Sequence, residues 1–322
     1  MTSTENFSQR VDALRKLIEE TDAIIIGAGS GLSTAAGLDY AGEDFRSEFA
    51  PWIERYGFTD LYTSGFYPFA TEEERWAYWA RHIWFSRFRT GGTELYHRLL
   101  PLVEGKEWFV ITTNTDGQFE QSGFARDRIF ATQGDYAYLQ SRSGEDKELV
   151  YCKDWVFRAM AATEDCRIPT SLVPRHPRTG ELLAPNLRCD DTFVEDDRWH
   201  QQAERYHDFV RQHCQGRLLL LEFGIGFNTP AIIRFPFEHM ALNFPQTALV
   251  RFNRDYPDAS LEGIEGHFMA FTEDISAILN ELCLPVEQLE YYDLRPTPPI
   301  VLHANLNDGT VREGFKGSRY SK

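Results

Sequence analysis

Short apolar runs, each followed by glycine or by polar residues, recur along the chain and predict the strands of a buried sheet. Runs that are apolar at every position are typical of parallel strands covered on both faces. The pattern predicts five strands, at 24–26, 108–112, 129–132, 218–223 and 248–253. Apolar residues spaced three and four apart predict helices at 5–21, 71–81, 93–103, 118–122, 196–213 and 271–282. Strands that alternate with helices indicate the α/β class.

Two segments depart from this alternation. In 140–200, short apolar patches alternate with proline, glycine and charge, which predicts a small appended module. Segment 45–90 is rich in aromatic residues, including Trp76, Tyr78 and Trp79. Aromatic side chains on a predicted helix are more often buried in a core than used to bind a ligand, so we expect a core here.

The stretch 23–38 carries the first candidate for chemistry. Three branched residues are followed by Gly27, Gly29 and Gly31 at alternate positions, and then by a predicted helix start. Strand, glycine loop and helix form a phosphate-binding turn, because glycine lets the backbone approach the phosphates and the N–H groups of the helix end face the anion. The loop alone leaves open a tight turn in an ordinary α/β unit.

Polar residues follow the second and third predicted strands. Thr113, Asn114 and Asp116 follow the second strand, and Gln133 follows the third. Open α/β sheets place their chemistry at the carboxyl ends of the strands, which makes these residues candidates. A turn with a helix N-cap is the plainer explanation of Asn114 and Asp116.

Composition excludes several classes of function. The chain has 322 residues, of which 42% are hydrophobic, enough for a sizeable core. A formal net charge of −16 argues against non-specific nucleic-acid binding, which needs basic stripes. No apolar run approaches a membrane span, and the N-terminal residues lack the features of a signal peptide. Five cysteines without paired spacing indicate free thiols, so we expect a cytoplasmic protein.

With these stretches in place, the chain resembles the sirtuins over nearly its whole length. Residues 29–38 match the family's G-A-G-x-S-x-x-S-G-I loop without a gap, residues 112–116 match T-Q-N-I-D, and residues 122–123 match the A-G that follows. Gly224 and Asn253 fall where the family binds phosphate and the adenosine ribose. Segment 187–195 is similar to the strand pair that clamps substrate in that family.

The resemblance implies NAD as the cofactor and an architecture of two parts. We expect a Rossmann-like parallel sheet with helices on both faces, plus a smaller inserted module made of a helical segment and a degenerate zinc-ribbon-like segment. The implied NAD-binding large domain comprises 1–44, 91–138 and 200–290. The small-domain insertions would be 45–90 and 139–199, and a C-terminal tail would follow at 291–322.

Three departures from the family pattern point to one class within it. Residues 39–42, Asp-Tyr-Ala-Gly, replace P-D-F-R, Gln133 replaces the catalytic His of the H-G pair, and the loop 224–230 replaces G-T-S. These features are similar to the macrodomain-linked, class M sirtuins. That likeness implies NAD-dependent mono-ADP-ribosyl transfer to a lipoylated, glycine-cleavage-H-like carrier protein. It also implies a macrodomain hydrolase as a functional partner, with no nucleic acid and no membrane.

Gln133 decides which reaction we expect. In deacylating sirtuins a His removes a proton from a ribose hydroxyl, and an amide cannot take up a proton near neutral pH. An amide can still hydrogen-bond to the ribose hydroxyls, and direct transfer of ADP-ribose needs no such deprotonation. A weak NAD-dependent deacylase and an inactive sensor of NAD or ADP-ribose remain as alternatives.

The resemblance also implies a role for each candidate residue. Asp116 would hold the nicotinamide carboxamide and Asn114 the ribose or its water. Asn186 and Arg188 would line the substrate groove, where Arg188 would steer an acidic acceptor or hold a pyrophosphate. We expect the catalytic residues to be Asn114, Asp116, Gln133 and Arg188. We expect the cofactor to contact Gly29, Ser30, Gly31, Leu32, Ala36, Phe45, Thr113, Asn114, Asp116, Gln133, Gly224, Gly226 and Asn253.

Two of these assignments have plainer alternatives, and the metal site of the family is altered. Arg188 could form only a salt bridge to Asp190 or Asp191, and Phe45 could pack in a core instead of shielding the sugar. Sirtuins hold zinc with two C-x-x-C pairs. Those pairs would fall in 140–144 and 176–179, and the chain contains no C-x-x-C. We therefore expect no zinc, although His176 with scattered cysteines could in principle ligate a metal.

Overall fold

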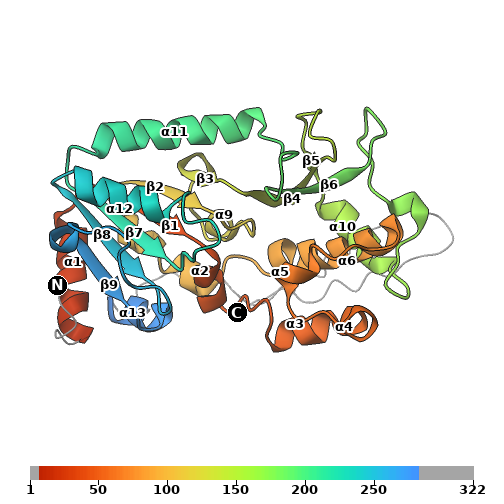
Figure 1. Cartoon of the computed structure of the whole chain (residues 1–322), viewed down its shortest axis with the longest axis horizontal. Helices are drawn as coiled ribbons and strands as arrows, with labels where there is room; N and C mark the ends of the chain where they lie inside the picture. The colour runs from red at the N-terminus through yellow and green to blue at the C-terminus, as the bar shows by residue number, and fades with distance from the viewer. Residues whose placement is uncertain (1–6, 283–322) are drawn as a thin grey trace, which may run out of the picture. The chain divides into compact units, whose positions relative to one another are not determined.

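The computed structural model describes residues 7–282 and contains a six-stranded sheet in which all neighbours are parallel (Figure 1). The strand order is β3-β2-β1-β7-β8-β9. The first three strands of the chain therefore form one half of the sheet, from β1 at the centre to β3 at the edge. The last three form the other half, from β7 beside β1 to β9 at the opposite edge. The order reverses between β1 and β7, and in open α/β sheets ligands bind at such a switch point. The strands are β1 (Ala23–Ala28), β2 (Glu107–Thr112), β3 (Ile129–Ala131), β7 (Leu218–Phe223), β8 (Thr247–Phe252) and β9 (Phe268–Phe271).

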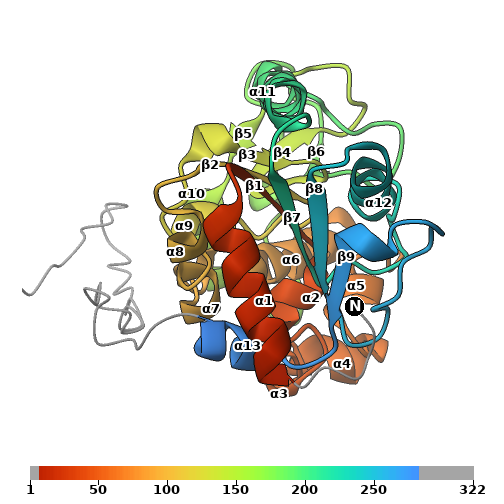
Figure 2. The same cartoon turned by 90° about the vertical axis from the view of Figure 1, so that its left-hand side faces the viewer.

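Helices cover both faces of this sheet (Figure 2). Neighbouring strand residues point to opposite faces, so Ile24 and Ile26 belong to one hydrophobic cluster and Ile25 belongs to another. The first face is covered by α1 (Phe7–Glu20), α2 (Ser30–Ala35), α7 (Glu94–His97), α8 (Leu100–Val103), α9 (Gln118–Gln121) and α13 (Ile275–Leu282). The second face is covered by α11 (Asp197–His213) and α12 (Arg234–Asn243).

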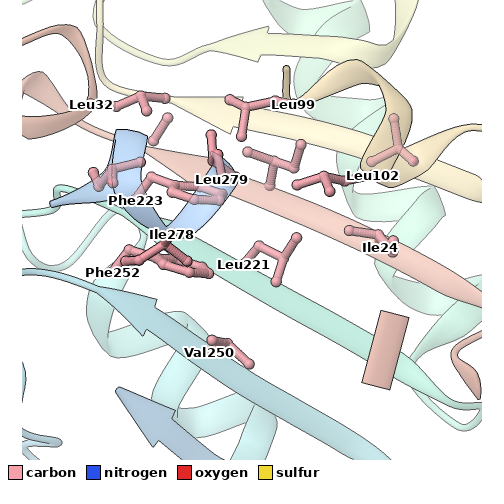
Figure 3. Packing of buried hydrophobic residues seen from close by; sticks show 14 of the residues in the cluster. Ile24, Leu32, Leu99, Leu102, Leu221, Phe223, Val250, Phe252, Ile278 and Leu279 are labelled. Atoms are coloured by element: carbon pink, nitrogen blue, oxygen red, sulfur yellow. The ribbon is translucent and has the colours of Figure 1, made fainter. Parts of the chain in front are cut away.

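The core of the first face continues up to the edge where the strands end (Figure 3). Phe223, Phe252 and Phe271 occupy aligned positions at the ends of β7, β8 and β9. Their rings stack in a row, with centroids 4.3 Å and 5.3 Å apart and planes within 8° of parallel. These stacked rings hold the strand ends in place. The loops that follow β7 and β8 carry Gly224 and Asn253, two of the predicted cofactor residues.

A second, antiparallel sheet has the order β5-β4-β6 and packs with its own helices. Its strands are β4 (Gly134–Ser141), β5 (Val150–Tyr151) and β6 (Leu183–Leu187). The helices are α3 (Glu43–Glu48), α4 (Ala50–Tyr56), α5 (Leu61–Ser64), α6 (Glu72–Ile83) and α10 (Lys153–Ala161). Trp76, Tyr78 and Trp79 are at most 5% exposed in the hydrophobic cluster of this part. The expectation that these aromatic residues form a core is confirmed.

The structure confirms the α/β class and the Rossmann-like sheet, and it corrects several elements. Phe271 ends strand β9, which the sequence did not predict, and the last helix begins only at Ile275. The predicted helix at 93–103 is two short helices, because Pro101 cannot donate a backbone hydrogen bond within a longer one. In 187–195 only Leu187 belongs to a strand, so the predicted strand pair is wrong.

The predicted domain boundaries stay predictions, and the tail at 291–322 lies outside the described residues. Between residues 7 and 282, no helix combines the length and the apolar character needed to cross a bilayer.

Candidate active site

The loops after β1 and β7 touch each other at the switch point. The backbone N–H groups of Gly29 and Gly31 donate to the carbonyl oxygens of Phe223 and Gly224, at 3.0 Å and 3.1 Å. A Cβ on Gly31 would lie 2.7 Å from the Cα of Gly224, and a Cβ on Gly224 would lie 2.5 Å from the carbonyl carbon of Gly31. Gly224 also has a φ of +61°, which side-chain-bearing residues rarely adopt. The close contact between the two loops therefore requires glycine at positions 31 and 224, independently of any role in phosphate binding.

Asn114 and Asp116 meet this loop through a buried hydrogen-bond network. The Asn114 Nδ2 donates to the Gly29 carbonyl oxygen at 2.9 Å and to the Ser33 Oγ at 3.1 Å. Ser33 in turn donates to the Asp116 Oδ2 at 2.5 Å, and the Tyr96 hydroxyl lies 2.8 Å from the Ser33 Oγ. All four side chains are at most 9% exposed. The structure thus brings the predicted loop and the predicted polar residues together.

Sequence reasoning missed Ser33 and Tyr96. Ser33 lies inside the matched loop, where it occupies the family's first serine position, so the motif itself could have identified it. Tyr96 occupies an ordinary apolar position of a predicted helix, and no sequence signal distinguishes it from a core residue. Only the fold shows that its hydroxyl reaches the network.

Burial raises the pKa of Asp116, and hydrogen bonds from Ser33 and from the Gln118 backbone N–H offset this only in part. A carboxyl group whose pKa is higher in the folded state stabilises the fold below its unfolded pKa, and that contribution is lost as the pH rises through the folded pKa. Replacing Asp116 by asparagine should therefore become progressively more favourable to stability as the pH rises above about 4, the ordinary pKa of an aspartate, until the pH has passed the folded pKa of Asp116. Urea unfolding of both proteins at several pH values measures this trend.

Asp190→Asn is the matched control for this prediction. The Asp190 carboxylate accepts hydrogen bonds from the Thr192 hydroxyl, at 2.6 Å, and from its N–H, at 2.8 Å, and these lower the pKa of Asp190. Above about pH 4 the stability of Asp190→Asn relative to the unchanged protein should stay nearly constant, because a carboxyl group with a lowered pKa contributes fully above its unfolded pKa and loses that contribution only at lower pH. Parallel trends for the two variants would contradict the prediction for Asp116.

Gln133 lies two residues after the end of β3, and its side chain is buried with an amide oxygen that is unpaired within the described part of the chain. The side chain is 8% exposed, and among residues 7–282 its Oε1 has no hydrogen-bond partner. Parallel pairing places Thr112 beside Ala131, so Asn114 and Gln133 each follow the ends of neighbouring strands. A buried acceptor without a partner costs free energy, and a hydroxyl group of a ligand would satisfy it.

The two predicted substrate residues occupy different environments. Asn186 is 2% exposed, accepts from the Asp135 N–H at 3.2 Å and donates to the Gln140 Oε1 at 3.0 Å, so it joins β6 to β4. Arg188 donates its backbone N–H to the Gln133 carbonyl oxygen at 2.9 Å, which places the two residues side by side.

The guanidinium of Arg188 forms an ion pair, but with Glu195 instead of Asp190 or Asp191. It also lies over the Phe193 ring, 4.7 Å from the centroid. Its side chain is 38% exposed, so it remains accessible to a partner.

Several predicted cofactor residues prove to have structural contacts of their own. Phe45 is fully buried and stacks on Phe49 with centroids 5.1 Å apart, in agreement with the core alternative. Leu32 is fully buried in the core of the first sheet face. Asn253 donates to the Ile225 carbonyl oxygen at 2.7 Å, and thereby connects the loops after β7 and β8. Ser30 and Gly226 are exposed, whereas Ala36 and Thr113 are partly exposed.

A cavity of about 50 Å³ extends from the network toward the second sheet. Its lining includes Asn114, Asp116, Asp135, Asn186 and Trp199, which belong to segments far apart in the sequence. Polar residues from both sheets therefore converge on one hollow.

Arg87 braces the wall of this cavity. It lies in a π-helical turn, Trp84–Phe88, and sequence reasoning did not identify it. Its Nε donates to the Asp135 Oδ1 at 2.9 Å, and its guanidinium lies so close to Gly117 that a Cβ there would be 2.3 Å from the guanidinium carbon. Gly117, with a φ of +66°, thus lets a buried arginine support the Asn114–Asp116 loop.

The four-thiolate zinc site of the sirtuin fold does not fit the residues present. Ser141, in the first predicted pair, donates to the Glu181 carboxylate at 2.8 Å, and burial raises the pKa of Cys152 to about 12, so that this thiol stays protonated. Within the described part of the chain, Asp146, Glu148 and His176 are close enough together to hold an ion, but Arg178 already pairs with both carboxylates. The absence of zinc stays a prediction.

Comparison with known proteins shows the family to which the chain belongs. No family model matches the chain. It is 33% identical over 277 residues to a protein ADP-ribosyltransferase of Staphylococcus aureus strain Mu50, covering 84% of this chain and 86% of that protein. It is 30% identical over 239 residues to a probable bifunctional ADP-ribose hydrolase/ADP-ribosyltransferase of Fusarium oxysporum f. sp. cubense, covering 71% of this chain and 39% of that protein.

Solved structures show the same fold. A Sir2 homologue mutant in complex with 2'-O-acetyl ADP-ribose matches with a TM-score of 0.54 at 16% identity, over 84% of this chain and 94% of that one. A structure of a Sir2 enzyme matches with a TM-score of 0.53 at 12% identity, over 86% and 97% of the two chains. The predicted family and type of enzyme are confirmed: the chain belongs to the sirtuin-type protein ADP-ribosyltransferases.

Proposed function

We propose that this protein transfers ADP-ribose from NAD to a side chain of an acceptor protein. The observation that carries the proposal is the buried amide of Gln133, whose Oε1 has no partner in the described part of the chain. Deacylation by this fold needs a proton acceptor at that position, and an amide does not take up a proton near neutral pH. Transfer needs only that the ribose be held while a nucleophile attacks.

NAD supplies the electrophile, because the bond between its ribose and nicotinamide can break with a neutral leaving group. The Asn114 amide and the Asp116 carboxylate would hold the reacting end, since their orientation is fixed by the Gly29 carbonyl and by Ser33. Gln133 would accept a hydrogen bond from a ribose hydroxyl. The contacting loops of Gly31 and Gly224 would bind the diphosphate with backbone groups.

A preorganised, buried site of this kind lowers the barrier by orientation and by excluding water. The acceptor would approach Arg188, whose exposed guanidinium can attract an acidic protein surface.

We further propose that the acceptor is a lipoylated carrier protein and that a macrodomain hydrolase reverses the modification. The carrier follows from the resemblance to class M sirtuins. The hydrolase is supported by the name of the Fusarium relative, which combines an ADP-ribose hydrolase with an ADP-ribosyltransferase.

The direct test incubates the protein with NAD labelled in its adenylate part and with the carrier in lipoylated and unlipoylated forms. Label on the lipoylated carrier, removed by a macrodomain hydrolase, would support the proposal. Acyl-ADP-ribose formed from an acyl-lysine peptide, with no labelled carrier, would instead identify a deacylase. Tight NAD binding without turnover would identify a sensor.

Replacing Gln133 by alanine should lower the transfer rate about tenfold to a hundredfold, as expected for a hydrogen bond that orients the reacting sugar. The exposed Gln246 provides the control, and Gln246→Ala should transfer at the unchanged rate. Initial rates of nicotinamide release and of carrier labelling measure both variants. Equal rates for Gln133→Ala and the unchanged protein would show that Gln133 does not contact the sugar.

A further inference from the structure

Tyr96 is a fully buried residue whose hydroxyl contacts the candidate site. It lies on the short helix α7, is 0% exposed and packs edge-on against Phe119 with centroids 4.9 Å apart. Its hydroxyl oxygen lies 2.8 Å from the Ser33 Oγ and 3.2 Å from the Asn114 Nδ2. The hydroxyl thus lies between the segment that carries the glycine loop and the segment that carries the candidate catalytic residues.

The direction of each hydrogen bond in this cluster follows from its neighbours. The Gly29 carbonyl can only accept, so the Asn114 group that faces it must be the NH₂ group. Ser33 donates its single proton to Asp116, so its oxygen can only accept from Asn114 and Tyr96. Burial raises the pKa of Tyr96, so its hydroxyl keeps the proton that it donates to Ser33.

This assignment leaves the amide of Asn114 with one stable orientation. Its NH₂ group faces three acceptors, on Gly29, Ser33 and Tyr96. Its Oδ1 has no hydrogen-bond partner among residues 7–282. A flip of the amide would place two acceptors, the Gly29 carbonyl and the Asn114 oxygen, against each other, which a buried site disfavours.

We infer that Tyr96 is a positioning residue for Asn114. Its hydroxyl, which is hydrogen-bonded to Ser33 and contacts the Asn114 Nδ2, holds the Asn114 amide in the orientation that presents the amide oxygen to the donor groups of the ligand. The inference rests on the proposed function, since it takes Asn114 to contact the reacting end of NAD. Without the hydroxyl, Ser33 loses one of the two donors to its oxygen, so its hydroxyl group is held less firmly toward Asp116. Both candidate catalytic side chains would then lose part of their preorganisation.

The test removes only the hydroxyl. Tyr96→Phe retains the ring and its contact with Phe119, so the packing of α7 is preserved. The expected result is about a tenfold lower kcat for nicotinamide release, with the KM for NAD changed less than about twofold, because orientation and not binding is lost. In the background of Ser33→Ala, Tyr96→Phe should have a smaller further effect, because one of its two connections to Asn114 runs through the serine and only the direct contact with the Asn114 Nδ2 remains.

Tyr78→Phe is the matched control. Tyr78 is also 0% exposed, and its hydroxyl lies 3.0 Å from the Leu61 carbonyl oxygen and 3.0 Å from the His82 Nδ1, in the aromatic core. Both variants remove a buried hydroxyl with two partners, so both should lower the melting temperature, whereas only Tyr96→Phe should lower kcat.

Two results would overturn the inference. If Asn114→Ala is inactive while Tyr96→Phe has the kcat of the unchanged protein, the inference fails and the proposed function stands. If Asn114→Ala releases nicotinamide at the unchanged rate, the proposed site fails, and the role of Tyr96 fails with it.

Discussion

Replacing Asn114 by alanine should lower the rate of ADP-ribosyl transfer at least about a hundredfold, the usual effect of removing one preorganised polar group from a transition state. The Asn114 amide is 9% exposed and is held by Gly29 and Ser33. Asn114 follows β2, and Gln133 follows the neighbouring strand β3. Alanine removes both the oxygen presented to the ligand and the hydrogen bonds that tie the loop after β2 to the loop after β1. Initial rates of carrier labelling and of nicotinamide release would both show the loss.

Asn243→Ala is the control for Asn114→Ala. Asn243 is exposed, and its side chain bonds only the His239 carbonyl oxygen of its own helix, at 2.7 Å. This control should keep the unchanged transfer rate. Calorimetry with ADP-ribose, which lacks the nicotinamide, should show that Asn114→Ala still binds the remainder of the cofactor within about tenfold of the unchanged affinity. A fully active Asn114→Ala would show that the reacting end of NAD lies elsewhere.

The sheet was predictable because its strands differ so clearly from the rest of the sequence. Ile24 to Ile26 and Leu218 to Leu221 are buried on both faces, which only a strand between two helical layers requires. Strand β9 was missed because it has four residues, lies at the sheet edge and ends shortly before an apolar helix. Periodicity cannot separate so short a strand from the start of a helix.

The candidate site was predictable to the extent that its residues follow strand ends. Asn114, Asp116 and Gln133 were identified because polar residues interrupt apolar runs at these places. Tyr96 and Arg87 were not, because each comes from a helical segment whose position depends on tertiary packing. For three other residues the sequence predicted ligand contacts from motif position alone. In the fold these residues also make structural contacts of their own, as Asn186, Phe45 and Asn253 show.

The second large effect is expected for Gly224→Ala, which should destabilise the fold by about 2–4 kcal/mol and abolish measurable NAD binding. The substitution combines two costs. A side chain at a φ of +61° is strained, and the new Cβ would lie 2.5 Å from the backbone of Gly31. The loops after β1 and β7 would have to separate, and the switch point of the sheet would lose the surface on which the diphosphate is expected to bind.

Two further glycines separate the two costs. Gly105 has a φ of +75°, and no atom lies within 4 Å of the position that a Cβ would occupy there, so Gly105→Ala should cost only about 1–2 kcal/mol and leave NAD binding unchanged. Gly31 has no left-handed φ, but its Cβ would lie 2.7 Å from the Gly224 Cα, so Gly31→Ala should resemble Gly224→Ala in binding. Urea unfolding and calorimetry with NAD measure all three variants. If Gly224→Ala behaves like Gly105→Ala, then close contact between the two loops does not form the cofactor site, and the diphosphate must bind elsewhere along the strand ends.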